Sequence, residues 1–157
     1  MYTKSYMDNI IESFTQSLNE IMTLQDLDNI KLGEALDIDP SIVRKWRFKG
    51  KDVRRKTLIK LADYFHCSIE YLCGKTTEYI KVEPQLSYPN FGERLTAVMA
   101  ETKTRPSQLF RGIHIDHSLY YYWLNGGEPN LTSLETLAEF FGVTLDYLVG
   151  REISNKS

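Results

Sequence analysis

The chain contains an internal repeat, which constrains the fold because two copies of one pattern build two similar packing units. At an offset of 77 residues, eight positions keep the same residue. They are Phe14, Leu18, Met22, Leu32, Ile38, Asp39, Ser41 and Trp46, matched by Phe91, Leu95, Met99, Leu109, Ile115, Asp116, Ser118 and Trp123. Beyond the tryptophans the offset is 76, and we interpret the change as one residue lost from the intervening loop. Seven further identities follow there: Leu58, Leu61, Ala62, Phe65, Tyr71, Leu72 and Gly74, matched by Leu134, Leu137, Ala138, Phe141, Tyr147, Leu148 and Gly150.

The matched positions are mainly apolar and recur at helical spacing, so each copy is expected to form helices around its own core. Five short helices fit each copy. In the first copy they carry Phe14 to Met22, Leu32 and Leu36, a third segment ending near Trp46, residues 57–65 and residues 68–72, and the last two are matched by residues 133–141 and 144–148. The predicted N-caps are Asp39 before Pro40, Asp116, Ser68 and Thr144, and the predicted stop at Gly142 is replaced by His66 in the first copy.

We therefore predict an all-α protein with two tandem five-helix domains. The first spans residues 1–75 and the second residues 90–151, with a linker at 76–89 and a tail at 152–157. The linker contains Pro84 and Pro89 and has no helical periodicity. Its apolar residues, Tyr79, Ile80 and Val82, predict that part of it docks against one of the domains.

Positive charge is concentrated in one segment of a chain whose net charge is −2. Between Arg44 and Lys60 there are nine basic residues and one acid, Asp52. Residues 1–77 hold 12 basic and 11 acidic residues, whereas residues 78–157 hold 7 and 10. Nucleic-acid binding draws affinity from neutralised phosphates, so the first copy is the stronger candidate for it.

The second and third predicted helices of each copy have the order of a helix-turn-helix: a bracing helix, a short break and a capped second helix. The second helix of such a unit presents its N-terminal residues to base edges in the major groove. Val43 and Trp46 are expected to face inward. The expected DNA-contacting residues of the first copy are then Ser41, Ile42, Arg44 and Lys45, flanked by Arg47, Lys49, Lys51, Arg54 and Arg55 as phosphate contacts.

The stretch from Gly126 to Gly150, with Trp123 before it, resembles the Cro and phage-repressor family of helix-turn-helix regulators, also named for the xenobiotic response element. Its most specific part reads Thr144-Leu145-Asp146-Tyr147-Leu148 with Gly150. The resemblance extends to both copies and implies a lambda-repressor-like five-helix domain, operator binding and a dimer on a two-fold site. The first copy departs from the pattern because it lacks the proline after its loop and places Val53-Arg54-Arg55 there.

The second copy departs from the pattern at its recognition helix, which contains neither arginine nor lysine. Two roles stay open for its exposed surface: contact with DNA, or binding of a dimer mate or another protein through aromatic side chains. The residues expected on this surface are His117, Ser118, Leu119, Tyr121 and Tyr122.

The cysteines, histidines and tryptophans of the chain do not form the pattern of a metal, redox or stacking site. Cys67 and Cys73 align with Val143 and Val149, so we expect buried, reduced thiols rather than a metal or redox site. His114, Asp116 and His117 lie close enough in sequence to suggest metal ligation, but Asp116 is expected to cap a helix and the histidines align with Asp37 and Pro40, so we expect no metal site there. Trp46 and Trp123 are expected in the cores rather than as stacking platforms for single strands. No catalytic motif and no cofactor-binding loop is present, and we expect neither enzyme activity nor a cofactor.

The leading interpretation is a cytoplasmic, sequence-specific double-stranded DNA-binding transcriptional repressor that reads an operator through its first copy. No apolar run is long enough to span a membrane and no secretion signal opens the sequence. The rival interpretation is a protein-interaction module, such as an antitoxin-like or phage-encoded adaptor. A third combines DNA binding by the first copy with assembly, including a homodimer, through the second.

Overall fold

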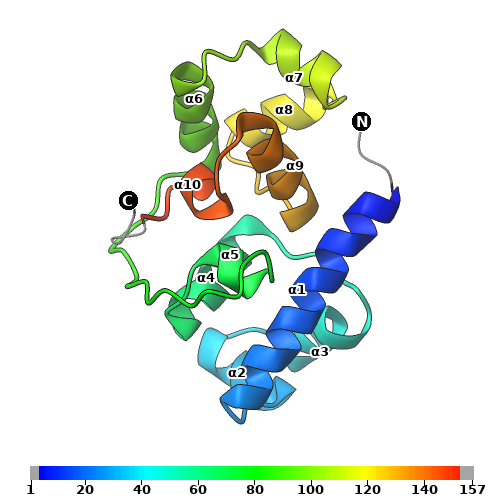
Figure 1. Ribbon diagram of the computed structural model, residues 1–157, viewed down its shortest axis with the longest axis vertical. Helices are drawn as coiled ribbons and strands as arrows, with labels where there is room; N and C mark the ends of the chain where they lie inside the picture. The colour runs from blue at the N-terminus through cyan, green and yellow to red at the C-terminus, as the bar shows by residue number, and fades with distance from the viewer. Residues whose placement is uncertain (1–3, 153–157) are drawn as a thin grey trace.

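The computed structural model describes residues 4–152, with side chains from residue 9 onward, and confirms the all-α prediction. The described residues form ten helices and no strand. In chain order they are α1 (Lys4–Leu24), α2 (Asn29–Leu36), α3 (Pro40–Phe48), α4 (Arg55–Phe65), α5 (Ile69–Leu72), α6 (Phe91–Glu101), α7 (Pro106–Gly112), α8 (His117–Leu124), α9 (Leu131–Phe141) and α10 (Leu145–Val149). Helices α4, α5, α9 and α10 lie in the middle of the molecule, between α2 and α3 at one end and α7 and α8 at the other (Figure 1).

The two series of helices have matching cores. Trp46 and Trp123 are buried, as expected, and each packs edge-on against the first matched phenylalanine of its own series. The ring centroids lie 6.5 Å apart for Phe14 and Trp46 and 5.9 Å apart for Phe91 and Trp123. The apolar positions of the repeat thus hold α1 against α3 and α6 against α8 in the same manner.

Backbone conformation repeats more completely than residue identity. Ten described residues have positive φ, and they form five pairs at the offsets of the repeat. The pairs are Asp26 and Lys103, Asp37 and His114, Gly50 and Gly126, His66 and Gly142, and Gly74 and Gly150. Since the left-handed conformation is uncommon outside glycine, this match shows that the two halves share their turn geometry.

The position of the lost residue differs from the sequence interpretation. Gly50 and Gly126 already stand at an offset of 76, so the loss lies between Trp46 and Gly50. Helix α3 has nine residues and α8 has eight. The extra residue therefore extends the C-terminal end of α3 and leaves the following loops equal in length.

The predicted helix ends are largely confirmed. Asp39 accepts a hydrogen bond from the Ser41 amide, and Pro40 opens α3. Ser68 and Thr144 cap α5 and α10 through their hydroxyl oxygens, and Gly142 and His66 end α9 and α4 in the left-handed conformation. Asp116 stands at the N-cap of α8 but accepts a hydrogen bond from the Ser118 hydroxyl instead of a backbone amide.

Helix α1 is longer than the repeat predicts. It begins at Lys4, ten residues before Phe14, whereas α6 begins at the matched Phe91. Helix α1 packs against α9 of the other series as well as against α3 and α5. This extension has no counterpart in α6, which is preceded by Pro89 and Asn90.

The segment between α5 and α6 docks against the first series and reaches the second. Val82 is buried, and its amide donates to the carbonyl of His66 at 3.1 Å. The Tyr79 hydroxyl donates to the same carbonyl at 2.9 Å. Gln85 donates through its side-chain amide to the carbonyl of Gly150. Val82 and the Tyr79 hydroxyl therefore dock part of the predicted apolar cluster on the C-terminal end of α4.

Both cysteines are free and buried. Burial raises the pKa of the Cys67 thiol to about 12 and that of Cys73 well above its usual value. Because the thiolate is the reactive form, we expect neither thiol to react with a disulfide reagent at about pH 8 while the protein is folded. Spectrophotometric thiol titration tests this, with the same protein in guanidinium chloride as the control that should release both thiols. Rapid labelling of the folded protein would show that the core around α5 opens readily.

Candidate nucleic-acid interface

Helices α2 and α3 form a compact pair joined by a short turn. The turn reverses at Asp37, which has φ of 57°, and the Ile38 amide donates to the Gly33 carbonyl at 2.8 Å. A Cβ on Gly33 would lie 2.5 Å from the Ile38 carbonyl oxygen, so this close turn requires glycine in α2. Val43 and Trp46 face the core, as predicted, and the opposite side of α3 is left toward solvent.

The outward side of α3 and the turn after it carry exposed basic residues. Arg44 and Lys45 are exposed on α3, and Lys49 and Lys51 are exposed just beyond it. Ser41 is exposed in the first turn of the helix. These five residues, which we call the α3 basic surface, lie where the helix-turn-helix interpretation requires them.

Ile42 and Arg47 were expected on the same surface but are only half exposed. Ile42 packs against the hydrophobic core. Arg47 is held by hydrogen bonds to the side-chain oxygens of Asn19 and Asn29, and its guanidinium lies 4.9 Å from the centroid of the exposed Phe48 ring. Arg47 therefore joins α1, α2 and α3 and has fewer donors free for a phosphate.

Arg55 does not belong to the exposed surface, which corrects its prediction as a phosphate contact. Its side chain is 4% exposed and forms an ion pair with Glu128, with Nε 2.9 Å from Oε1. Nη2 donates to the other carboxylate oxygen at 3.1 Å, and Nη1 donates to the Pro89 carbonyl. A buried, bidentate guanidinium of this kind contributes to packing between the two series rather than to DNA contact.

Arg54 stays exposed but is also drawn toward the second series. Its Nη1 donates to the Glu128 carbonyl at 3.1 Å. The predicted run of basic residues after α3 is thus divided, because Lys49 and Lys51 point to solvent whereas Arg54 and Arg55 turn toward the other half of the protein.

Helices α7 and α8 form the corresponding pair in the second series. Tyr120 and Trp123 are buried on the inner side of α8. The predicted surface residues are all exposed: His117, Ser118, Leu119, Tyr121 and Tyr122. The His117 ring lies 3.8 Å, centroid to centroid, from Phe110 of α7, which fixes the first turn of α8 against its bracing helix.

Helix α7 and the turn before it carry basic residues that were not among the predicted DNA-contacting residues. Lys103, Arg105 and Arg111 are exposed there. At the 77-residue offset they replace Asp26, Asp28 and Glu34 of the first series, so a position-by-position comparison of charge between the copies would have found them. In a helix-turn-helix the bracing helix crosses the DNA backbone, and basic residues on α7 suit contact with phosphates.

A comparison with known protein families matches the segment that contains α7 and α8. A family model described as "Helix-turn-helix" matches residues 102–148, from the end of α6 through most of α10. Residues 102–148 are therefore similar to a helix-turn-helix domain, which supports the Cro and phage-repressor resemblance for this part of the chain. Neither the curated proteins nor the solved structures yield a significant match.

Within the part of the chain that the structure describes, no three His, Cys, Asp or Glu side chains are grouped so that they could hold a metal ion. No helix among the same residues is long and apolar enough to cross a membrane.

Proposed function

We propose that this protein is a sequence-specific double-stranded DNA-binding transcriptional repressor built from two tandem helix-turn-helix domains. The observation that carries this proposal is the α3 basic surface, whose four basic residues, Arg44, Lys45, Lys49 and Lys51, are exposed on and after a helix whose other side packs against the core. The family match to residues 102–148 supports the same class of activity for the second domain. Repression would follow from occupancy of the operator and would need no catalytic step.

The two domains would contact DNA with different chemistry. Arg44, in the middle of α3, is suited to bidentate recognition of guanine, and the lysines supply point charge to phosphates. In the second domain, phosphate contacts would come from Lys103, Arg105 and Arg111, leaving the hydroxyls and imidazole of α8 to contact the bases.

Selection of bound duplexes from a random library, at about 150 mM salt, tests the proposal. Recovery of a defined motif is the expected result, because purely electrostatic binding is weak and unselective at that salt concentration. Absence of enrichment, with only weak salt-sensitive binding, would contradict it.

The second candidate function is a protein-interaction module. The observation that favours it is the aromatic surface of α8, where Tyr121 is 53% exposed and Tyr122 49% exposed. Tyrosines are enriched in the cores of protein interfaces. Co-purification of a stoichiometric protein partner through α8, together with a failed DNA selection, would favour this candidate.

A further inference from the structure

The contacts between the loops that follow α3 and α8 are related by an exchange of the two copies. The Arg55 amide donates to the Pro129 carbonyl at 2.9 Å, and the Leu131 amide donates to the Val53 carbonyl at 2.8 Å. Adding 76 to one residue and subtracting 76 from its partner converts either bond into the other. Arg54 and Asn130, themselves 76 residues apart, face each other in an antiparallel bridge between these two bonds.

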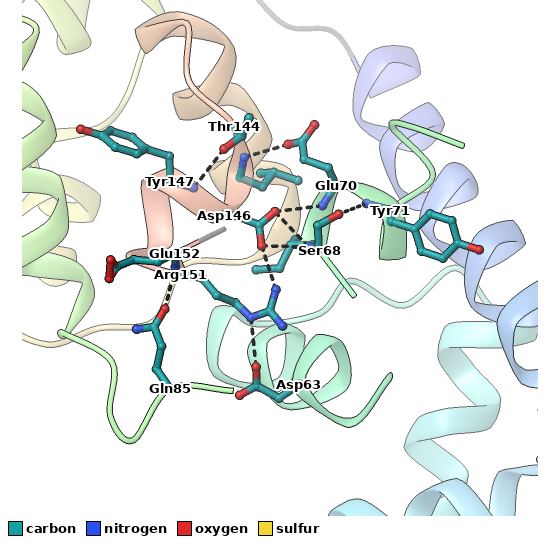
Figure 2. A network of polar contacts seen from close by, with 12 residues as sticks. Asp63, Ser68, Glu70, Tyr71, Gln85, Thr144, Asp146, Tyr147, Arg151 and Glu152 are labelled. Atoms are coloured by element: carbon teal, nitrogen blue, oxygen red, sulfur yellow. Dashed lines mark hydrogen bonds and ion pairs between the residues drawn. The ribbon is translucent and has the colours of Figure 1, made fainter. Parts of the chain in front are cut away.

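The N-termini of α5 and α10 repeat this exchange with carboxylates. Glu70 accepts a hydrogen bond from the Leu145 amide at 2.8 Å, and Asp146 accepts one from the Ile69 amide at 2.9 Å. Glu70 and Asp146 are matched positions of the repeat, as are Ile69 and Leu145. Figure 2 shows the two carboxylates reaching across to the opposite helix from both sides.

Reciprocal contacts of this kind are what a two-fold axis produces between identical subunits, where residue i meets j and j meets i. Here they occur between two halves of one chain. The two domains are therefore packed as an internal pseudo-two-fold pair, and the second domain occupies the position that a second copy of the first would take in a symmetric dimer.

The side chains at this interface fit two unlike domains. Arg55 pairs with Glu128, whereas the residue matched to Arg55 in the second domain is Leu131. Two second domains paired in the same way would place leucine beside Glu128 and leave its carboxylate without the guanidinium. Asp52, matched to Glu128, instead accepts bonds from the Leu131 amide and the Thr132 hydroxyl.

The linker between α5 and α6 forms hydrogen bonds with both domains. The Tyr88 hydroxyl donates to the Asp63 carboxylate at 2.9 Å. Gln85 donates to the Gly150 carbonyl, and its own side-chain oxygen accepts from the Glu152 amide. Contacts with both domains favour pairing within one chain over exchange of domains between chains.

Because the two domains are packed against each other, the positions of the two recognition helices, α3 and α8, are fixed relative to each other. Helices α3 and α8 lie at opposite ends of the molecule, and both lie to the right of α5 and α10 in Figure 1. One of them presents arginine and lysine, and the other presents tyrosine, serine and histidine. A rigid pair with unlike reading surfaces suits two unlike half-sites.

We propose that one chain binds one duplex as a monomer, on an operator made of two half-sites that differ in sequence and are held at one fixed spacing. This inference rests on the proposed DNA-binding function. It replaces the symmetric homodimer implied by the family resemblance with an internal pair.

The test uses the full chain and the duplex that it selects. We expect two unlike half-sites and one chain per duplex by native mass spectrometry. Inserting about five base pairs between the half-sites turns one of them to the other face of the helix, and affinity should fall by on the order of 100-fold as one domain loses its site. An insertion of about ten base pairs restores the original face of the helix, but affinity should stay low, because a rigid pair of domains cannot span the added length.

Variants of exposed residues show which domain reads which half-site. Arg44→Ala should relax the selected sequence in one half only, and Tyr121→Ala in the other half only. A palindrome occupied by two chains, both variants changing the same half, or full affinity after either insertion would overturn the internal pair while leaving DNA binding intact. A selection without any enrichment would instead remove the proposed function and the inference with it.

Discussion

Replacing Asp146 with alanine is expected to lower the free energy of unfolding by about 3–5 kcal/mol, the usual cost of removing one partner from a buried ion pair. Asp146 is 1% exposed and accepts hydrogen bonds from the Ile69 and Glu70 amides of the first helical series. Its Oδ1 lies 2.9 Å from Nη1 of Arg151, whose side chain is fully buried. Alanine leaves that guanidinium with Asp63 as its one ionic partner among the described residues, and leaves the Ile69 and Glu70 amides without this acceptor (Figure 2).

Denaturant unfolding of the purified protein measures this effect, with Glu20→Ala on the exposed side of α1 as the matched control, expected to change stability by about 0.5 kcal/mol or less. Burial raises the pKa of Asp146 despite the adjacent Arg151, so the ion pair does not fully offset the cost of desolvation. The double variant Asp146→Ala with Arg151→Met should therefore recover part of the loss. A single-variant effect below about 1 kcal/mol would show that water reaches this interface and satisfies the freed groups.

Replacing Arg44 with alanine is expected to weaken operator binding by about 1–3 kcal/mol and to relax sequence preference at one position, because arginine reads a base edge through two hydrogen bonds. Replacing Lys51 is expected to weaken binding to all sequences alike. A lysine at a phosphate releases counterions on binding, so its loss should also reduce the salt dependence by about one unit of slope. Titrations of both variants against selected and scrambled duplexes at several salt concentrations separate the two effects.

Arg55 provides the matched comparison within the same basic run. Its guanidinium is committed to Glu128 and Pro89, so Arg55→Met should change stability and leave the slope of affinity against salt unaltered. If Arg44→Ala and Lys51→Ala both bind like the parent protein, the α3 basic surface is not the surface that holds DNA.

Much of the fold was predictable because its signals are local. Apolar spacing identified the inward residues of α3, and capping residues identified where α3, α5, α9 and α10 begin or end. The N-terminal extension of α1 was not predictable from the repeat, because it has no partner in the second copy and packs on α9, more than 100 residues further along the chain.

The candidate site was predictable in part for the same reason. Arg44 and Lys45 are exposed because their helix phase opposes Val43 and Trp46, which the sequence displays directly. The burial of Arg55 depends on Glu128, 73 residues away, and no pattern near Arg55 distinguishes it from the exposed Lys51.

The two helical series, the turns between their helices and the concentration of charge on α3 follow from the sequence, since periodicity, caps and charge act over a few residues. How the two series face each other depends on contacts between distant residues, which appear only in the folded structure. The reciprocal bonds of Glu70 with Leu145 and of Asp146 with Ile69 join residues about 75 apart, and such contacts form only where the two helical series meet and the unpaired amides at the start of each short helix face a carboxylate.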